Sequence, residues 1–163
     1  MKTQELFDIL ANKIADKIQT SHGLTKFAQR RAKFEGWLKV EIIDILGQQE
    51  IHALPEIERI DVTFDNVCIE LKTVNTNIGY DNVVRDITRP ITKNTNSIIK
   101  DIEKLSTNSY QDKFVLFIVF PVEHNNPFWQ KQLRTIKTNL SELIYKESCF
   151  KNEVPFVVYL GKI

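Results

Sequence analysis

Asp61, Glu70 and Lys72 are the side chains of this chain whose types and spacing best suit chemistry. The dipeptide Asp65-Asn66 between the two acids is typical of the tight turn of a β-hairpin. The pairing set by this turn places Asp61 opposite Glu70, and Lys72 emerges on the same face. Carboxylates opposed at roughly 5 Å between Cβ atoms repel each other, and a hard cation such as Mg²⁺ reverses that sign. Lys72 then orients a water molecule or holds a phosphate oxygen.

The opposite face of this hairpin is predicted to be entirely apolar. A period of two along residues 59–72 sends the apolar side chains to one side, namely Ile60, Val62, Phe64, Val67, Ile69 and Leu71. Arg59 joins the two acids and Lys72 on the other side. One face is therefore predicted to be core, and the other to be a site.

A simpler interpretation of the charged face stays open. Asp61 with Lys72, and Arg59 with Glu70, are diagonal neighbours that neutralise each other on a solvated sheet, each pair contributing little. An acid-x-Lys triplet also arises by chance in a chain with 21 acidic residues. The register with Asp61, the apolar reverse face and the preceding helix together favour the site.

That preceding helix is predicted from about Arg30 to Leu46, with Gly47 ending it. Its apolar stripe consists of Phe34, Leu38, Ile42 and Ile45. Glu35 and Glu41 lie at opposite edges of this stripe, so periodicity does not choose between them. Each glutamate either adds a third carboxylate to a metal site or pairs with a nearby cation.

This order of elements resembles the PD-(D/E)XK nuclease superfamily, which has the restriction-endonuclease-like fold. The resemblance covers roughly residues 30–120: a helix carrying a glutamate, then Asp61, then Glu70-Leu71-Lys72, then a helix and a strand. Ile60 stands where the motif has proline, a residue that does no chemistry. The first core strand of the family must fall between residues 48 and 58.

The resemblance implies roles for individual residues. Asp61 and Glu70 bind Mg²⁺, for which Mn²⁺ substitutes, and Lys72 assists the attacking water. Glu35 supplies a third metal ligand, with Glu41 as the alternative. The implied protein is a metal-dependent DNA endonuclease of restriction or phage-defence type, often a homodimer. Its implied fold is α/β, with a mixed central β-sheet flanked by α-helices.

Length and composition predict a single domain. The chain has 163 residues, of which 42% are hydrophobic, enough to bury one core. We expect an N-terminal helix within residues 1–29, the catalytic core over 30–120, and a C-terminal helix and strand over 121–163. No apolar run reaches the length of a membrane span, so we expect a cytoplasmic protein with no membrane partner. Cys68 and Cys149 are too few for a disulfide framework.

Hydrophobic patterning predicts the remaining elements. The expected helices and strands are a helix over 3–20, a helix over 96–105, a strand buried on both faces over 114–120, a helix opened by Asn126-Pro127, and a strand over 154–160. The stripe predicted for the helix after Pro127 runs through Trp129, Leu133, Ile136, Leu140 and Leu143.

A polar loop is expected over residues 75–96, longer than most connections in a compact domain. The candidate nucleic-acid contacts in or near it are Tyr80, Arg85, Arg89, Lys93 and Lys100. In one interpretation the loop is a lid that neutralises phosphates and stacks Tyr80 on a base. A flexible or partly helical insertion is the equal alternative.

Three functions are compatible with these patterns. The first is a magnesium-dependent nuclease acting on DNA. The second is a non-catalytic nucleic-acid-binding module that keeps the nuclease architecture. The third is a protein-interaction or immunity factor whose hairpin charges face a partner. The intact Asp61, Glu70 and Lys72 favour the enzyme, because a fold retained only for binding has no need of opposed acids.

Overall fold

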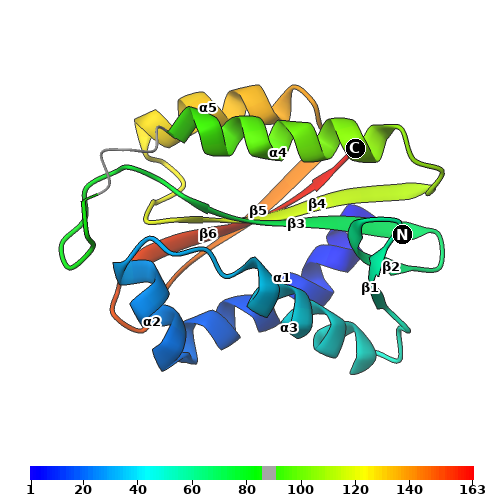
Figure 1. Cartoon of the computed structure of the whole chain (residues 1–163), viewed down its shortest axis with the longest axis horizontal. Helices are drawn as coiled ribbons and strands as arrows, with labels where there is room; N and C mark the ends of the chain where they lie inside the picture. Colours follow the sequence, from blue (N-terminus) through cyan, green and yellow to red (C-terminus); the bar gives the residue numbers. More distant parts are fainter. Residues whose placement is uncertain (86–90) are drawn as a thin grey trace.

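The computed structural model describes residues 1–85 and 91–163 and has an α/β architecture with one mixed six-stranded sheet (Figure 1). The sheet order is β1-β2-β3-β4-β6-β5. The strands are β1 (Leu54–Ile57), β2 (Ile60–Phe64), β3 (Val67–Asn75), β4 (Asp112–Phe120), β5 (Glu142–Cys149) and β6 (Pro155–Lys162). The helices are α1 (Thr3–Thr20), α2 (His22–Gln29), α3 (Glu35–Gly47), α4 (Ile91–Ser106) and α5 (Pro127–Lys137).

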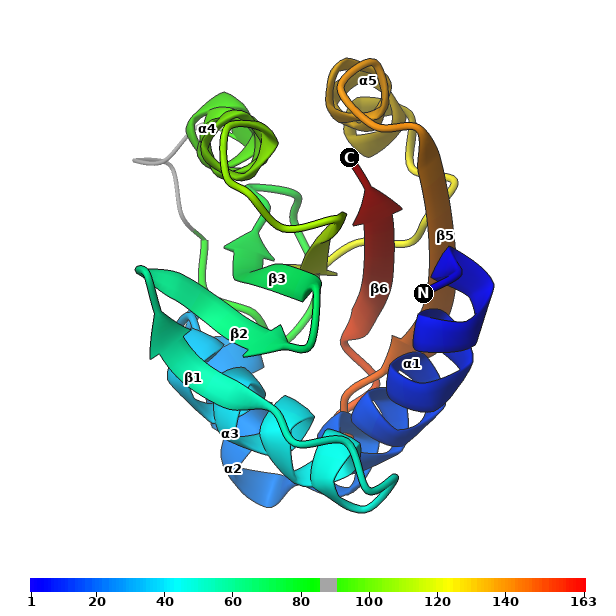
Figure 2. The same ribbon diagram turned by 90° about the vertical axis from the view of Figure 1, so that its right-hand side faces the viewer.

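The strands β1, β2 and β3 form an antiparallel meander, and the crossover through α4 makes β4 parallel to β3. β6 pairs antiparallel with β4, and β5 is the far edge. Helices α1, α2 and α3 cover one face of the sheet, while α4 and α5 cover the other (Figures 1 and 2). No helix within the described ranges is long and apolar enough to cross a bilayer.

The central strand β4 is buried on both faces, as its unbroken apolar sequence predicts. Phe114, Leu116 and Ile118 join the core beneath α1 and α3, whereas Val115 and Phe117 join the core beneath α4 and α5. The sheet therefore has a large hydrophobic core on each of its two faces.

The predicted β2–β3 hairpin is confirmed. Phe64 pairs with Val67 across the two-residue turn, where Asp65 has a φ of 47°. The five predicted core residues on the α1–α3 side are Val62, Phe64, Val67, Ile69 and Leu71. The placement of Ile60 on that side is wrong, because it packs with Cys68 and Leu105.

The predicted start of α3 at Arg30 is wrong, since the helix begins at Glu35. Arg31 has a φ of 53°, which interrupts helical geometry, and the short helix α2 precedes it. The buried Arg31 guanidinium donates hydrogen bonds to three carbonyl groups of the segment after β3, those of Thr76, Ile78 and Val84. This clamp holds the approach to α3 against that segment.

The loop after β3 is shorter than predicted, because α4 begins at Ile91 rather than near residue 96. The polar residues at its start are buried and satisfied: the Asn94 side-chain amide donates to the Asn75 carbonyl, and the Thr95 hydroxyl to the Ile91 carbonyl. The first turns of α4 were predicted to be a loop because their residues are mostly polar.

The stripe assigned to α5 is correct only as far as Ile136. The helix ends at Lys137, so Leu140 follows it and Leu143 belongs to β5. Strand β5 was missed because it is an edge strand of mixed polarity, and its leucine fell by coincidence on the helical spacing.

A neutral polar cluster lies beneath α5, formed by His124, Trp129 and Tyr159. The Tyr159 hydroxyl accepts a hydrogen bond from Trp129 Nε1 at 2.7 Å and lies 2.8 Å from His124 Nδ1. Burial raises the pKa of Tyr159 far above its usual range and lowers the pKa of His124. We call these three residues the tyrosine cluster.

Candidate active site

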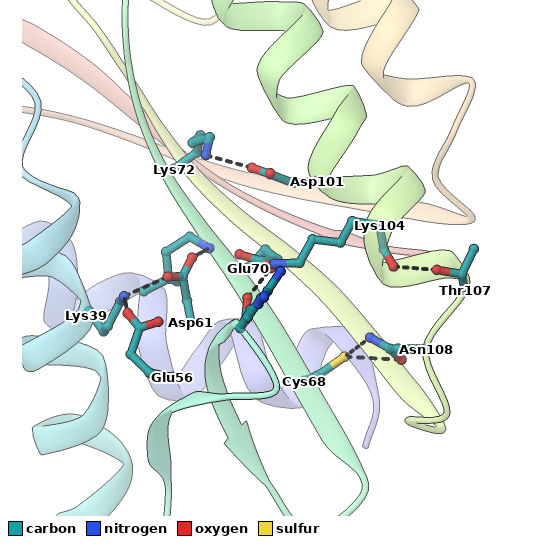
Figure 3. A network of polar contacts seen from close by, with 12 residues as sticks. Lys39, Glu56, Asp61, Cys68, Glu70, Lys72, Asp101, Lys104, Thr107 and Asn108 are labelled. Atoms are coloured by element: carbon teal, nitrogen blue, oxygen red, sulfur yellow. Dashed lines mark hydrogen bonds and ion pairs between the residues drawn. The ribbon is translucent and has the colours of Figure 1, made fainter.

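The candidate active site forms where β2 separates from β3, on the face of the sheet that α4 covers (Figure 3). The paired register runs from Phe64 and Val67 to Val62 and Ile69, and the next residues along the two strands are Asp61 and Glu70. The Asp61 carboxylate reaches across and accepts a hydrogen bond from the Leu71 backbone N–H at 2.8 Å. The Asp61 carboxylate thus replaces a backbone carbonyl of β2 as the acceptor for the Leu71 N–H. This places the carboxylate between β2 and β3.

The carboxyl groups of Asp61 and Glu70 interact, and each shifts the pKa of the other. Burial and the neighbouring Asp61 raise the pKa of Glu70 to about 7, outweighing the nearby Lys104. Burial acts in the same direction on Asp61, but hydrogen bonds from Glu70, Lys39 and the Leu71 N–H hold its pKa below the usual value. The pair therefore carries one shared proton below neutral pH and a destabilising second charge above it.

Two lysines neutralise this acidic pair. Lys39 of α3 lies 2.7 Å from Asp61 and also bonds Glu56, whereas Lys104 of α4 donates to the Glu70 carboxylate and to the Arg59 carbonyl (Figure 3). Because each acid has an ammonium partner, the charge repulsion is offset within the protein.

Lys72 takes a different partner. Its ammonium lies 2.9 Å from the carboxylate of Asp101 on α4 (Figure 3). Burial by itself lowers the pKa of Lys72, but its ion pair with Asp101, with further contributions from the charges of Glu35 and Asp61, raises it overall. Lys72 is therefore a charged ammonium within the field of three acids.

The structure separates the two candidate glutamates of α3. Glu41 forms an ion pair with Lys17 of α1 at 2.6 Å, on the side of the helix away from the hairpin. Glu35 is the first residue of α3, and its negative charge acts on Lys72. Its Oε2 atom is shielded from solvent and has no hydrogen-bond partner among the described residues. Glu35 therefore lies beside the predicted site, and Glu41 does not.

Within the described part of the chain, no three His, Cys, Asp or Glu side chains form a ready-made metal-binding group. The donor set nevertheless fits a hard divalent cation, because it consists only of carboxylates. Glu35 contributes an orphaned buried oxygen, and Asp61 and Glu70 crowd two carboxyl groups together. In the structure described, the ammonium groups of Lys39 and Lys104 supply the positive charge that compensates Asp61 and Glu70.

The predicted nucleic-acid contacts are only partly gathered. Lys93 and Lys100 are exposed on α4, and with Lys104 they fall within about 40° of one another around the helix. Arg85 is exposed at the end of the described segment after β3. Tyr80 is half-buried and packs against the α1–α3 core rather than standing free. Arg89 lies outside the described residues.

Sequence patterns did not predict Lys39, Asp101 and Lys104 as partners of the acids and of Lys72. A hint for α4 is the pair of opposite charges at Asp101 and Lys104, three residues apart beside the buried Ile102. No comparable signal marks Lys39, because its two acidic partners come from other elements of the chain.

Comparisons with known proteins give no independent assignment. No family model matches the chain, and neither the search of curated proteins nor that of solved structures found a match.

Proposed function

We propose that this protein is a metal-dependent nuclease that hydrolyses phosphodiester bonds in DNA. The observation that carries the proposal is the enforced closeness of Asp61 and Glu70, with Lys72 on the same strand as Glu70. Burying two adjacent carboxyl groups opposes folding. A cation-dependent reaction gives a reason for the chain to keep them.

The order of elements supports the same proposal. A glutamate-bearing helix, a three-stranded meander, a helix and a parallel strand follow one another as α3, β1 to β3, α4 and β4. The resemblance to the PD-(D/E)XK superfamily rests on a glutamate-bearing helix, Asp61, Glu70-Leu71-Lys72, a helix and a strand in this order. A restriction-endonuclease-like core, and a homodimer in which two sites address two strands, are part of the proposal.

Asp61 and Glu70, with Glu35 as the third carboxylate, would hold Mg²⁺ or Mn²⁺. The bound ion supplies a Lewis acid that polarises the scissile phosphate and lowers the pKa of a coordinated water. The Lys72 ammonium orients the attacking water or stabilises charge on the phosphate. Hydrogen bonding by the Leu71 N–H keeps the Asp61 carboxylate directed toward β3.

The substrate class is supported by the lysines of α4. Lys93, Lys100 and Lys104 form a basic stripe that ends at Glu70. Positive charges spaced along a helix neutralise successive phosphates of a nucleic-acid strand. The stripe would therefore lead a strand toward the proposed site.

A second function is favoured by the ion pairs of Lys39 and Lys104. Because these lysines already neutralise Asp61 and Glu70, the same fold is able to serve as a non-catalytic nucleic-acid-binding module. That function predicts salt-dependent DNA binding without strand cleavage.

The two functions are separated by nicking of supercoiled plasmid DNA with Mg²⁺ or Mn²⁺. We expect cleavage by the wild-type chain and at least about a hundredfold loss in Asp61→Ala and in Lys72→Ala, the size of loss that removing one charge-stabilising group produces. Asp16→Asn and Lys26→Ala are matched controls, because both residues are exposed on other helices. DNA binding without cleavage supports the second function, and undiminished cleavage by both site variants contradicts the assignment of the site.

A further inference from the structure

Asp101 is an acidic residue at this site with no place in the proposed metal-binding set. It lies on the face of α4 that looks toward β3, and its side chain is only 17% exposed (Figure 3). Its Oδ2 atom lies 2.9 Å from Lys72 Nζ, and no second donor among the described residues reaches this oxygen. The Asp101 carboxylate is therefore dedicated to Lys72.

The pairing belongs to a crossed set of four charges. Glu70 and Lys72 are two residues apart on β3, and Asp101 and Lys104 are three residues apart on α4. Glu70 pairs with Lys104, and Lys72 with Asp101. The two spacings are about 6.6 Å along the strand and about 4.5 Å along the helix, so they differ by only about 2 Å. One turn of α4 thus contacts both functional residues of β3.

Lys72 differs from the other two lysines of the site in its choice of partner. Lys39 and Lys104 bond directly to Asp61 and Glu70. Lys72 also experiences the charges of Glu35 and Asp61. A long, flexible lysine without a fixed partner would swing toward those acids and occupy the space that a cation needs.

We infer that Asp101 is a positioning residue, which holds the Lys72 ammonium on the α4 side of the site and so keeps Glu35 and Asp61 available for a metal ion. This inference rests on the proposed nuclease function. It assigns Asp101 no contact with substrate, because its effect passes through Lys72. Side chains that orient a functional group in this way change metal affinity or activity by about 10- to 100-fold when altered.

The test compares Asp101→Asn with the wild type in two measurements. Plasmid cleavage with Mn²⁺ should show kcat reduced by about 10- to 100-fold with KM within about twofold, a loss within the range found for such orienting partners. Calorimetric titration with Mn²⁺ alone should show weaker binding, because the released ammonium competes for the carboxylates. Glu103→Gln, an exposed acid on the same helix, is the control and should match the wild type in both.

Two further variants separate positioning from a general loss of structure. Asp101→Glu keeps the carboxylate and should recover most of kcat. In a double-mutant cycle, Asp101→Asn should have no further effect on Mn²⁺ binding once Lys72→Ala is present. A wild type that cleaves DNA together with an unaltered Asp101→Asn variant overturns the inference. A wild type that neither cleaves nor binds Mn²⁺ overturns the proposed function itself.

Discussion

The candidate active site and the tyrosine cluster are two polar groups on the α4 and α5 side of the same sheet, and they are built in opposite ways. In the tyrosine cluster, the Tyr159 hydroxyl lies between Trp129 Nε1 and His124 Nδ1. All three of these groups are uncharged. At the candidate site, charged acids and lysines compensate one another imperfectly, and Glu70 has a strongly raised pKa.

The contrast separates groups that support the fold from groups that work against it. Buried neutral groups with partners contribute modestly to stability, whereas buried charges are retained at a net cost. The tyrosine cluster is also wrapped in ring contacts, such as the stack of Tyr159 on Phe117 at 4.9 Å between centroids. The two regions should therefore respond to substitution with opposite signs.

The largest effect should come from Trp129→Ala in the tyrosine cluster. Trp129 is fully buried, so we expect the free energy of unfolding to fall by about 3–5 kcal/mol. Chemical denaturation at neutral pH measures this change. The neighbouring Phe128, which is 74% exposed, is the control, and Phe128→Ala should change stability by at most about 0.5 kcal/mol. If Trp129→Ala lowered the free energy of unfolding by less than about 1 kcal/mol, the tyrosine cluster would not stabilise the fold as this comparison requires.

The opposite sign is expected for Glu70→Gln at the candidate site. The pKa of Glu70 is about 7 in the folded chain against a usual value of 4.5, so between these pH values the folded chain binds more protons than the unfolded chain. Wild-type stability therefore falls as pH rises through this window, by an amount on the order of 3 kcal/mol.

Because Glu70→Gln removes this titration, the variant should be more stable than the wild type at pH 8 and similar to it at pH 4. Urea unfolding at both pH values measures the difference. Glu103→Gln, an exposed glutamate of α4, should show no such gain. Equal stability of wild type and Glu70→Gln at pH 8 would mean that the raised pKa carries no energetic penalty.

The smallest effect is expected for Lys104→Gln, which tests whether the lysines of the site compete with a metal ion. Lys104 is 44% exposed and pairs with Glu70, so its replacement in Lys104→Gln should strengthen Mn²⁺ binding by about two- to fivefold, matching the energy of a partly exposed ion pair. Calorimetric titration without nucleic acid measures this. Lys100→Gln, at an exposed position of the same helix, should leave Mn²⁺ affinity unchanged. Weaker binding in Lys104→Gln would mean that the lysine assists the ion rather than competing with it.

The elements that could be predicted from the sequence were those determined by turn residues and by local hydrophobic patterns. The register of the β2–β3 hairpin followed from its Asp65-Asn66 turn and its alternating apolar residues, and β4 followed from its unbroken apolar run. The hairpin register was enough to bring Asp61, Glu70 and Lys72 together.

The unpredictable part depended on contacts between distant segments. Glu41 is separated from Glu35 by Lys17 of α1 and by the closeness of Glu35 to Lys72, contacts that the sequence of α3 does not contain. The pairing of Asp101 with Lys72 likewise depends on how α4 crosses β3. Boundaries failed where polar residues are satisfied by remote partners, as at Asn94, or where backbone conformation departs from a helix, as at Arg31.

The hydrogen bonds of Arg31 tie the residues that precede α3 to the segment that follows β3. One buried guanidinium grips the carbonyls of Thr76, Ile78 and Val84, and Glu35 follows four residues later along the chain. The start of α3, where Glu35 lies, is therefore anchored to the segment that follows β3.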